Sequence, residues 1–169
     1  MQKITPFLWF DTQAEEAARF YVDVFNGNPA KKIESKMGDD SLYKEANEEI
    51  SGKPKGSVMV ASFELEGQEY TALNGGPHFT FSGAISFVIN CKTQEEVDYF
   101  WQKLGEGGQT GQCGWINKDK FGVTWQVVPE ALGDFIGGSD EEGAERAMQA
   151  MLKMTKLDIE GLKNAYEGR

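Results

Sequence analysis

The chain has 169 residues, a formal net charge of −10 at pH 7 and 40% hydrophobic residues, among them 11 Phe and 4 Trp. This length suits one domain or two small fused half-domains, with enough core to fold without a metal or a disulfide. The acidic charge, with no basic stripe, excludes nucleic acid as a partner, because phosphate binding needs clustered Lys and Arg.

The remaining composition points to a cytoplasmic protein. No window approaches 18 apolar residues, so no segment is expected to enter a membrane. The N-terminal stretch MQKITPFLWFD does not have the pattern of a signal peptide. The two cysteines, Cys91 and Cys113, form no CxxC motif and cannot make a disulfide framework. A reducing cytoplasmic location is therefore expected.

The first elements in chain order are a strand and a helix. Residues 4–10 are rich in aromatics and other strand-forming residues, which predicts a strand. Apolar residues then recur at helical spacing over 14–25. Asp11 or Thr12 is expected to be the N-cap, with Thr12 and Glu15 at the spacing of a capping box, and Gly27 is a typical helix stop.

Three more strands are predicted to complete this half. The extended runs lie at 30–37, 57–65 and 68–74, and Glu66-Gly67 suits a tight hairpin between the last two. The polar segment 38–56 is rich in turn-forming residues, which predicts a long surface loop.

The strand–helix pattern returns 80 positions later. A second strand is predicted at 84–90, and Thr93 with Glu96 repeats the capping-box spacing before a helix that ends at Gly105. Extended runs follow at 110–114, 115–117 and 123–128. The offset predicts an internal duplication, with module one at 1–78 and module two at 83–129.

Two helices are predicted after the second module, within 139–167. Ser139 and Glu142 have capping-box spacing, and an apolar helical face follows. A last helix is predicted at 159–166. The stripe of Met148, Met151 and Met154 is either ordinary packing or a soft surface for a ligand or partner.

Four stretches resemble a known family: TPFLWFDTQAEEAARFYVDVF, YTALNGGPHFTF, AISFVINCKTQEEVDYFWQKL and CGWINKDKFGVTWQVVP. They resemble the PhnB-like branch of the vicinal-oxygen-chelate superfamily, which includes glyoxalases, bleomycin-resistance proteins and dioxygenases. The resemblance implies a single α+β domain over 1–169, in which two βαβββ modules form a curved mixed sheet around a cavity, followed by C-terminal helices. It also implies a homodimer, in which modules can be exchanged between subunits.

Members of this branch often carry the label 3-demethylubiquinone-9 3-methyltransferase, which implies S-adenosylmethionine as cofactor. A methyltransferase of the Rossmann type needs a glycine-rich turn between its first strand and the next helix. The glycine-rich segment 105–111 instead follows a helix and leads into a strand, which indicates a helix stop and a linker. No cofactor is therefore expected.

Metal-dependent members of the superfamily bind a divalent ion through two side chains from the first strands and two from the last strands. The 80-residue offset places the first two at Pro6 and Ser86, and the last strands supply Leu73 or Asn74, and Gln126. Pro6 and Leu73 have no donor atom, and neutral amides hold such ions weakly. No metal is expected at this place.

Other side chains allow two interpretations each. His78, the only histidine, suits a general base or a hydrogen-bonded loop residue. Cys113 suits a nucleophile or a small buried residue. Trp9 and Trp115 suit pocket walls or core packing. The leading hypothesis is an aromatic-lined cavity that binds a small organic molecule, with these candidate residues: Trp9, Asn74, His78, Ser86, Cys113, Trp115 and Gln126.

Two alternatives remain open. One is a metal-assisted lyase, isomerase or oxygenase that uses a shifted set of ligands, Asn74, His78 and Gln126. The other is the methyltransferase that the family label implies. The sequence leaves open whether the chain is catalytic at all.

Overall fold

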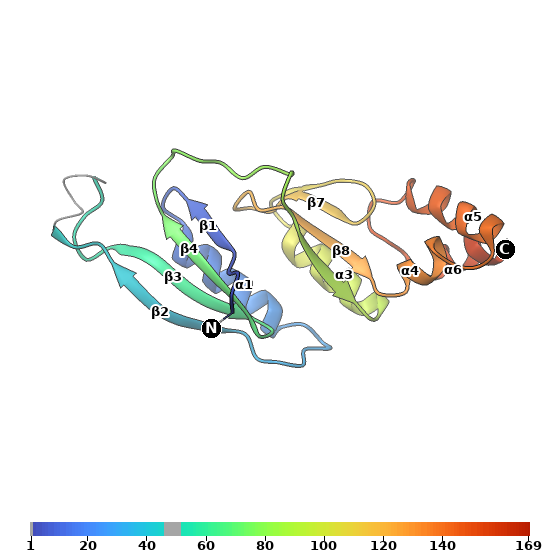
Figure 1. Cartoon of the computed structure of the whole chain (residues 1–169), viewed down its shortest axis with the longest axis horizontal. Coiled ribbons are helices and arrows are strands. Elements are labelled where there is room, and N and C mark those ends of the chain that lie inside the picture. Colours follow the sequence, from blue (N-terminus) through green and yellow to red (C-terminus); the bar gives the residue numbers. More distant parts are fainter. Residues whose placement is uncertain (1, 46–51) are drawn as a thin grey trace. The chain divides into compact units, whose positions relative to one another are not determined.

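A computed structural model describes residues 2–45 and 52–169 of the chain and divides it into two compact units, residues 1–81 and 82–169. Each unit contains one four-stranded mixed sheet and a helix packed against it (Figure 1). Both units have the order βαβββ, and further helices follow at the C-terminus. The predicted α+β fold is therefore confirmed.

The first unit has a sheet in the order β1-β4-β3-β2, with β1 parallel to β4 and the other pairs antiparallel. The helix buries Ala17, Ala18 and Tyr21 completely on the side that faces the sheet. Alternation along the strands leaves the opposite face of the sheet partly exposed. The elements are β1 (Phe7–Phe10), α1 (Ala14–Asn26), β2 (Lys36–Leu42), β3 (Val58–Leu65) and β4 (Gln68–Asn74).

The second unit repeats this arrangement with the strand order β5-β8-β7-β6, and β5 is parallel to β8. Its helix buries Val97, Phe100 and Leu104. The elements are β5 (Phe87–Cys91), α3 (Gln94–Gly105), β6 (Gln109–Thr110), β7 (Trp115–Lys118) and β8 (Trp125–Pro129), followed by α4 (Leu132–Ile136), α5 (Glu141–Met151) and α6 (Ile159–Glu167).

The link between α5 and α6 is held to the second unit by hydrogen bonds. The Gln94 side chain donates to the Leu157 carbonyl at 3.1 Å and accepts from the Ile159 N–H at 2.9 Å. The Leu157 side chain is fully buried. Gly114 has a positive φ, and its N–H donates to the Thr155 carbonyl at 2.8 Å. Within the second unit, these contacts tie the C-terminal helices to α3 and to the turn before β7.

The strand predicted at 30–37 is wrong, because β2 begins at Lys36 and continues to Leu42 into the segment predicted as a loop. The Asn26 side chain holds the preceding connection through two hydrogen bonds with the backbone of Ser35, at 2.8 and 2.9 Å. These bonds delay the return of the chain to the sheet. Residues 46–51 of the predicted loop lie outside the described residues.

Other predicted strands are also shorter in the structure, and two of them have a clear physical cause. The first begins at Phe7 instead of residue 4, since Pro6 has no N–H to donate to the ladder, although its carbonyl accepts from Thr71. The run at 110–114 keeps only β6, because Cys113 and Gly114 both have positive φ values and turn the chain. The hairpin at Glu66-Gly67 is confirmed, with φ values of 45° and 89°.

The helix starts are predicted with mixed success. Thr93 is the N-cap of α3 and accepts from the Glu96 N–H, as expected, and the Glu96 carboxylate accepts from the Lys92 N–H. The cap predicted at Asp11 or Thr12 is wrong, because the N-cap of α1 is Gln13 and its side chain makes no capping hydrogen bond.

The C-terminal starts also differ. The cap predicted at Ser139 lies one residue later, at Asp140, and the short helix α4 was not predicted. The last helix, predicted at 159–166, is confirmed as α6 with Asp158 as its N-cap.

Candidate functional site

The two units differ by one residue in the connection from the first strand to the helix. Three residues join β1 to α1, whereas only two join β5 to α3. The helices therefore start 80 positions apart, while the strands end 81 positions apart. A shift of one residue moves a strand side chain to the opposite face of a sheet, so the 80-residue offset assigns the strand positions wrongly.

The strand ladders give the correct correspondence. Leu8 pairs with Ala72 on the buried face of the first sheet, and Ile89 pairs with Val127 on the buried face of the second. On the open faces, the pair Phe7–Thr71 therefore corresponds to the pair Val88–Gln126. By the same alignment, the equivalent of Ser86 is Thr5, and the assignment of Pro6 to that position is wrong.

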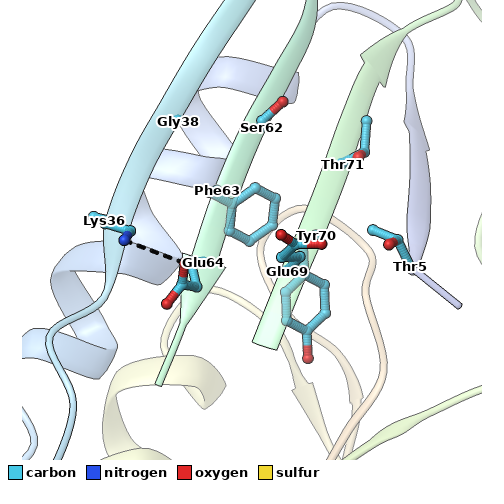
Figure 2. A pocket seen from close by; sticks show the side chains of 9 residues that line it. All are labelled: Thr5, Lys36, Gly38, Ser62, Phe63, Glu64, Glu69, Tyr70 and Thr71. Carbon is cyan, nitrogen blue, oxygen red and sulfur yellow. Dashed lines mark ion pairs between the residues drawn. The ribbon is translucent and has the colours of Figure 1, made fainter. Parts of the chain in front are cut away.

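The open face of the first sheet contains a hollow of about 400 Å³. Figure 2 shows the side chains of Ser62 and Glu64 on β3 and of Glu69 and Thr71 on β4, with Thr5 at the side of β4. Ser62 lies opposite Thr71 in the ladder, and Glu64 lies opposite Glu69. Hydroxyl and carboxylate groups therefore line this hollow.

Lys36 supplies a positive charge at the edge of this hollow. Its ammonium lies 3.4 Å from the Glu64 carboxylate, and the ion pair is drawn in Figure 2. Tyr70 and Phe63 also line the hollow, and their rings stack at 5.2 Å between centroids. Burial raises the pKa of the Tyr70 hydroxyl above its ordinary value, so this group is neutral at pH 7.

In the second unit, the structure brings together two of the predicted site residues. The Gln126 amide donates a hydrogen bond of 2.8 Å to the Ser86 hydroxyl, and both side chains are half-buried. The neighbouring Val88 is 51% exposed on the same face. This bond uses one amide hydrogen of Gln126 and one lone pair of the Ser86 hydroxyl, and it joins two predicted site residues on the open face of the second sheet.

The structure gives Asn74 a structural role. Its side-chain oxygen accepts from the Ala14 N–H at 2.8 Å, and its amide donates to the Val58 carbonyl at 3.0 Å. Its backbone carbonyl accepts from the Tyr43 hydroxyl. The side chain is buried and faces the start of α1, where it performs the capping that the sequence assigned to Thr12.

Trp9 packs over the glycines that follow β4. Its indole N–H donates to the Gly76 carbonyl at 2.8 Å, and a Cβ on Gly75 would lie only 2.2 Å from the indole. Phe79 meets the indole edge to face at 4.9 Å. His78 is exposed in the same segment. The indole is thus held by the backbone, while the imidazole is free to contact solvent.

Cys113 and Trp115 lie on the turn into β7 and on its first residue. The Cys113 thiol donates to the Met151 carbonyl at 3.5 Å, and its φ is +57°, which is uncommon for a residue other than glycine. Trp115 is half-buried. The backbone N–H of Cys113 also donates to the Met154 carbonyl at 2.8 Å, so Cys113 helps to hold the end of α5.

A second hollow, of about 380 Å³, lies beside the start of α1. The Tyr43 hydroxyl and the Asn74 side chain, which line it, are already bonded to backbone groups. Lys53, on its rim, forms an ion pair with Asp11 at 3.3 Å. Thr12, Glu15 and Glu16 also line this hollow.

The residues at the expected metal positions do not fit a tightly held divalent ion. With the corrected strand correspondence these residues are Thr5, Thr71, Ser86 and Gln126, which supply hydroxyls and one amide in place of imidazole or carboxylate. Within residues 2–45 and 52–169, no group of three or more His, Cys, Asp or Glu side chains could hold a metal. The shifted set of Asn74, His78 and Gln126 is divided between the two units.

S-adenosylmethionine also lacks a fitting cradle of the Rossmann type. The residues that join β1 to α1 and β5 to α3 contain no glycine. After α3, Gly108 serves close packing, since a Cβ at this residue would lie 2.2 Å from the Lys118 carbonyl.

In the part of the chain that the structure describes, no helix is long and apolar enough to cross a membrane.

Comparison with known proteins places these features in context. Residues 2–128 match the family described as 3-demethylubiquinone-9 3-methyltransferase. One solved structure is that of the PhnB protein from Bacillus cereus, which is described as a candidate 3-demethylubiquinone-9 3-methyltransferase. Its sequence is 34% identical to this chain, and the two structures superpose with a TM-score of 0.63. The match covers 76% of this chain and 99% of the Bacillus chain.

A second solved structure supports the fold alone. This Pseudomonas aeruginosa protein is 21% identical, has a TM-score of 0.56, and is matched over 77% of this chain and 98% of its own. A search of curated proteins finds no match.

Proposed function

We propose that this chain, which belongs to the 3-demethylubiquinone-9 3-methyltransferase family of PhnB-like proteins, binds a small organic molecule in the hollow on the first sheet. The observation that carries this proposal is the set of three hydroxyls, from Thr5, Ser62 and Thr71, around a space of about 400 Å³. Ligand pockets typically occupy 300–1,000 Å³ and use a few convergent polar groups to orient the ligand.

This proposal changes the place of the site and keeps its chemical class. Trp9 was expected to form an aromatic wall, but its indole N–H is bonded to a backbone carbonyl. Trp115, the other expected wall, lies on β7 in the second unit. The hydroxyl groups of Thr5, Ser62 and Thr71 instead line an open space. The contacts predicted at Trp9, His78, Ser86, Cys113, Trp115 and Gln126 stay untested and describe an alternative place for the ligand.

A ligand screen on a blocked variant tests the proposal. We expect small hydroxylated molecules to raise the melting temperature of the wild type, because a ligand that binds only the folded state stabilises it by about 2.7 kcal/mol at 100 times its Kd. Ser62→Phe fills the hollow and should abolish this effect. Ser139→Phe, on an exposed turn outside the hollow, is the matched control.

Two results would contradict the proposal. One is a complete absence of stabilising compounds in a screen that covers polar molecules of this size. The other is equal stabilisation of the wild type and of Ser62→Phe, provided that circular dichroism shows both to be folded.

Methyl transfer is the activity that the family description names. The connections after β1 and β5 do not supply the glycine-rich cradle of a Rossmann methyltransferase, so they do not fit S-adenosylmethionine bound in the Rossmann manner. Calorimetry should detect no heat of binding for this cofactor. A stoichiometric binding isotherm would restore the methyltransferase as the leading function.

The oligomeric state and location complete the proposal. We expect a homodimer, which is supported by exposed apolar residues at matching positions of the two units, Phe7 at 59% and Val88 at 51%. A reducing, cytoplasmic location is consistent with Cys91 and Cys113, which are both free thiols.

A further inference from the structure

The hollow on the first sheet has an uneven balance of charges. Two carboxylates, from Glu64 and Glu69, lie opposite each other on neighbouring strands and both line the hollow (Figure 2). Like charges at directly opposite positions of an antiparallel pair destabilise the sheet. Lys36 forms an ion pair with Glu64 at 3.4 Å. One negative charge of the lining, that of Glu69, is therefore left without a counter-charge.

The partners of Glu69 are neutral. One carboxylate oxygen accepts from the Gln2 backbone N–H at 3.2 Å, and the Gln2 side chain bonds the Glu69 backbone at 2.8 and 3.1 Å. Among the residues that the structure describes, Glu69 has no ion-pair partner. These contacts fix the backbone at Glu69 and leave one carboxylate oxygen available in a half-buried position.

Hydroxyl groups surround this carboxylate. Thr71 lies two residues after Glu69 on the same face of β4, and Ser62 on β3 lies opposite Thr71. Thr5 lines the same hollow. A hydroxyl can both donate and accept a hydrogen bond, so this lining suits a ligand that also carries hydroxyls. A charge-assisted bond between an ammonium and a carboxylate is about twice as strong as a neutral one.

We propose that the ligand of this hollow is a hydroxylated organic cation, whose single positive group binds Glu69 while its hydroxyls bind Ser62 and Thr71. The inference rests on the proposed binding function and adds the charge of the ligand to it. Lys36 is then a specificity-determining residue, because it neutralises Glu64 and limits the hollow to one positive charge.

Matched pairs of probes test the charge. Glucosamine and ethanolamine carry one positive charge, and glucose and ethylene glycol are their neutral counterparts. We expect calorimetry at low salt to give each cation an affinity roughly tenfold higher than that of its neutral counterpart. Added salt should weaken the binding of the two cations and leave that of the two neutral probes unchanged. Glucuronate, an anion, should bind more weakly than glucose.

Two variants of the lining separate this inference from a purely structural role. Glu69→Gln should reduce the affinity for glucosamine roughly tenfold and leave glucose unchanged, since only the charge is lost. Lys36→Met should tighten glucosamine binding, because it leaves Glu64 without its counter-charge. Glu66→Gln, on the hairpin turn outside the hollow, is the control that should change neither affinity.

The outcomes distinguish the two proposals. Equal binding of cationic and neutral probes, or an unchanged glucosamine affinity in Glu69→Gln, overturns the preference for a cation and leaves the binding function standing. Failure of both cations to bind also overturns the inference. The binding function itself is contradicted by either of two results in the wider screen: no compound stabilises the wild type, or Ser62→Phe and the wild type are stabilised equally.

Discussion

The side chain of Asn74 bonds two backbone groups that lie 60 and 16 residues away in the sequence. One is the first N–H of α1, and the other is the carbonyl at the start of β3. A residue that combines a helix cap with a strand contact links three elements of the first unit. Sequence reasoning could not find this role, because capping rules consider only neighbouring residues.

Replacement of Asn74 should therefore affect stability more than ligand binding. We expect Asn74→Ala to lower the free energy of unfolding by about 1–3 kcal/mol, because it leaves buried backbone groups unpaired. Urea denaturation measures this change. Asn90→Ala, at an exposed position of β5, should stay within about 0.5 kcal/mol of the wild type, and equal losses in the two variants would count against the structural role.

The two thiols should differ sharply in reactivity. Burial, with smaller contributions from Glu96 and Glu130, raises the pKa of the Cys91 thiol to about 12, so it stays protonated at pH 8. Cys113 is half-exposed. We expect one thiol per native chain to react with a disulfide reagent at pH 8, and two in urea. Cys113→Ser should remove the native reaction, and fast labelling in that variant would contradict the assignment.

The same thiol should make stability depend on pH above 9. The folded state holds the Cys91 proton more tightly than the unfolded state, so this contribution is complete below about pH 9 and is lost as the pH rises toward 12. We expect the free energy of unfolding to fall less steeply with pH in Cys91→Ala than in the wild type. Identical slopes would show that this thiol does not contribute.

At the scale of elements, the two strand–helix connections differ by one residue, and this difference decides which strand side chains face the open surface. The helices α1, α3, α5 and α6, the hairpin at Glu66-Gly67 and the cap at Thr93 follow from local patterns in the sequence, whereas the short helix α4 was not predicted. The register of β1 against β4 and of β5 against β8 does not follow from such patterns, because these strands lie far apart in the sequence. For that reason the offset led to Pro6, whereas the structure leads to Thr5.

Two of the three expected capping boxes, at Thr12 and at Thr93, provide a direct comparison. Thr93→Ala should lower the free energy of unfolding by about 1 kcal/mol, because the Thr93 hydroxyl accepts the Glu96 N–H. Thr12→Ala should change it by less than about 0.5 kcal/mol, since Thr12 is exposed and does not cap α1. Urea denaturation of both variants measures the difference, and equal effects would contradict the observed caps.

At the scale of the whole molecule, the duplication and the family could be predicted from the sequence, and the binding site could not. The family resemblance covers segments that form the strands and helices. The polar side chains of Ser62, Glu64 and Glu69 lie on the β3–β4 hairpin, whose two-residue turn was predicted and sets which of these residues lie opposite each other. The hollow also needs Lys36 on β2 and Thr5 before β1, and the pairing of these strands with β3 and β4 joins distant segments that no local pattern aligns.

The proposed homodimer gives a prediction at this scale. Light scattering should report a mass of twice 18.8 kDa at micromolar concentration, because exposed apolar side chains favour association. Dilution should shift the mass toward that of one chain. A mass of 18.8 kDa at all concentrations would contradict the homodimer.

The most direct test of the central claim is a nuclear magnetic resonance titration of the isotope-labelled chain with the compound that stabilises it best. The account predicts that the backbone amides of Thr5, Ser62, Glu69 and Thr71 shift together and saturate at one ligand per hollow, and that the shifts vanish in Ser62→Phe. Shifts confined to Ser86, Trp115 and Gln126, with none on β3 or β4, would contradict it.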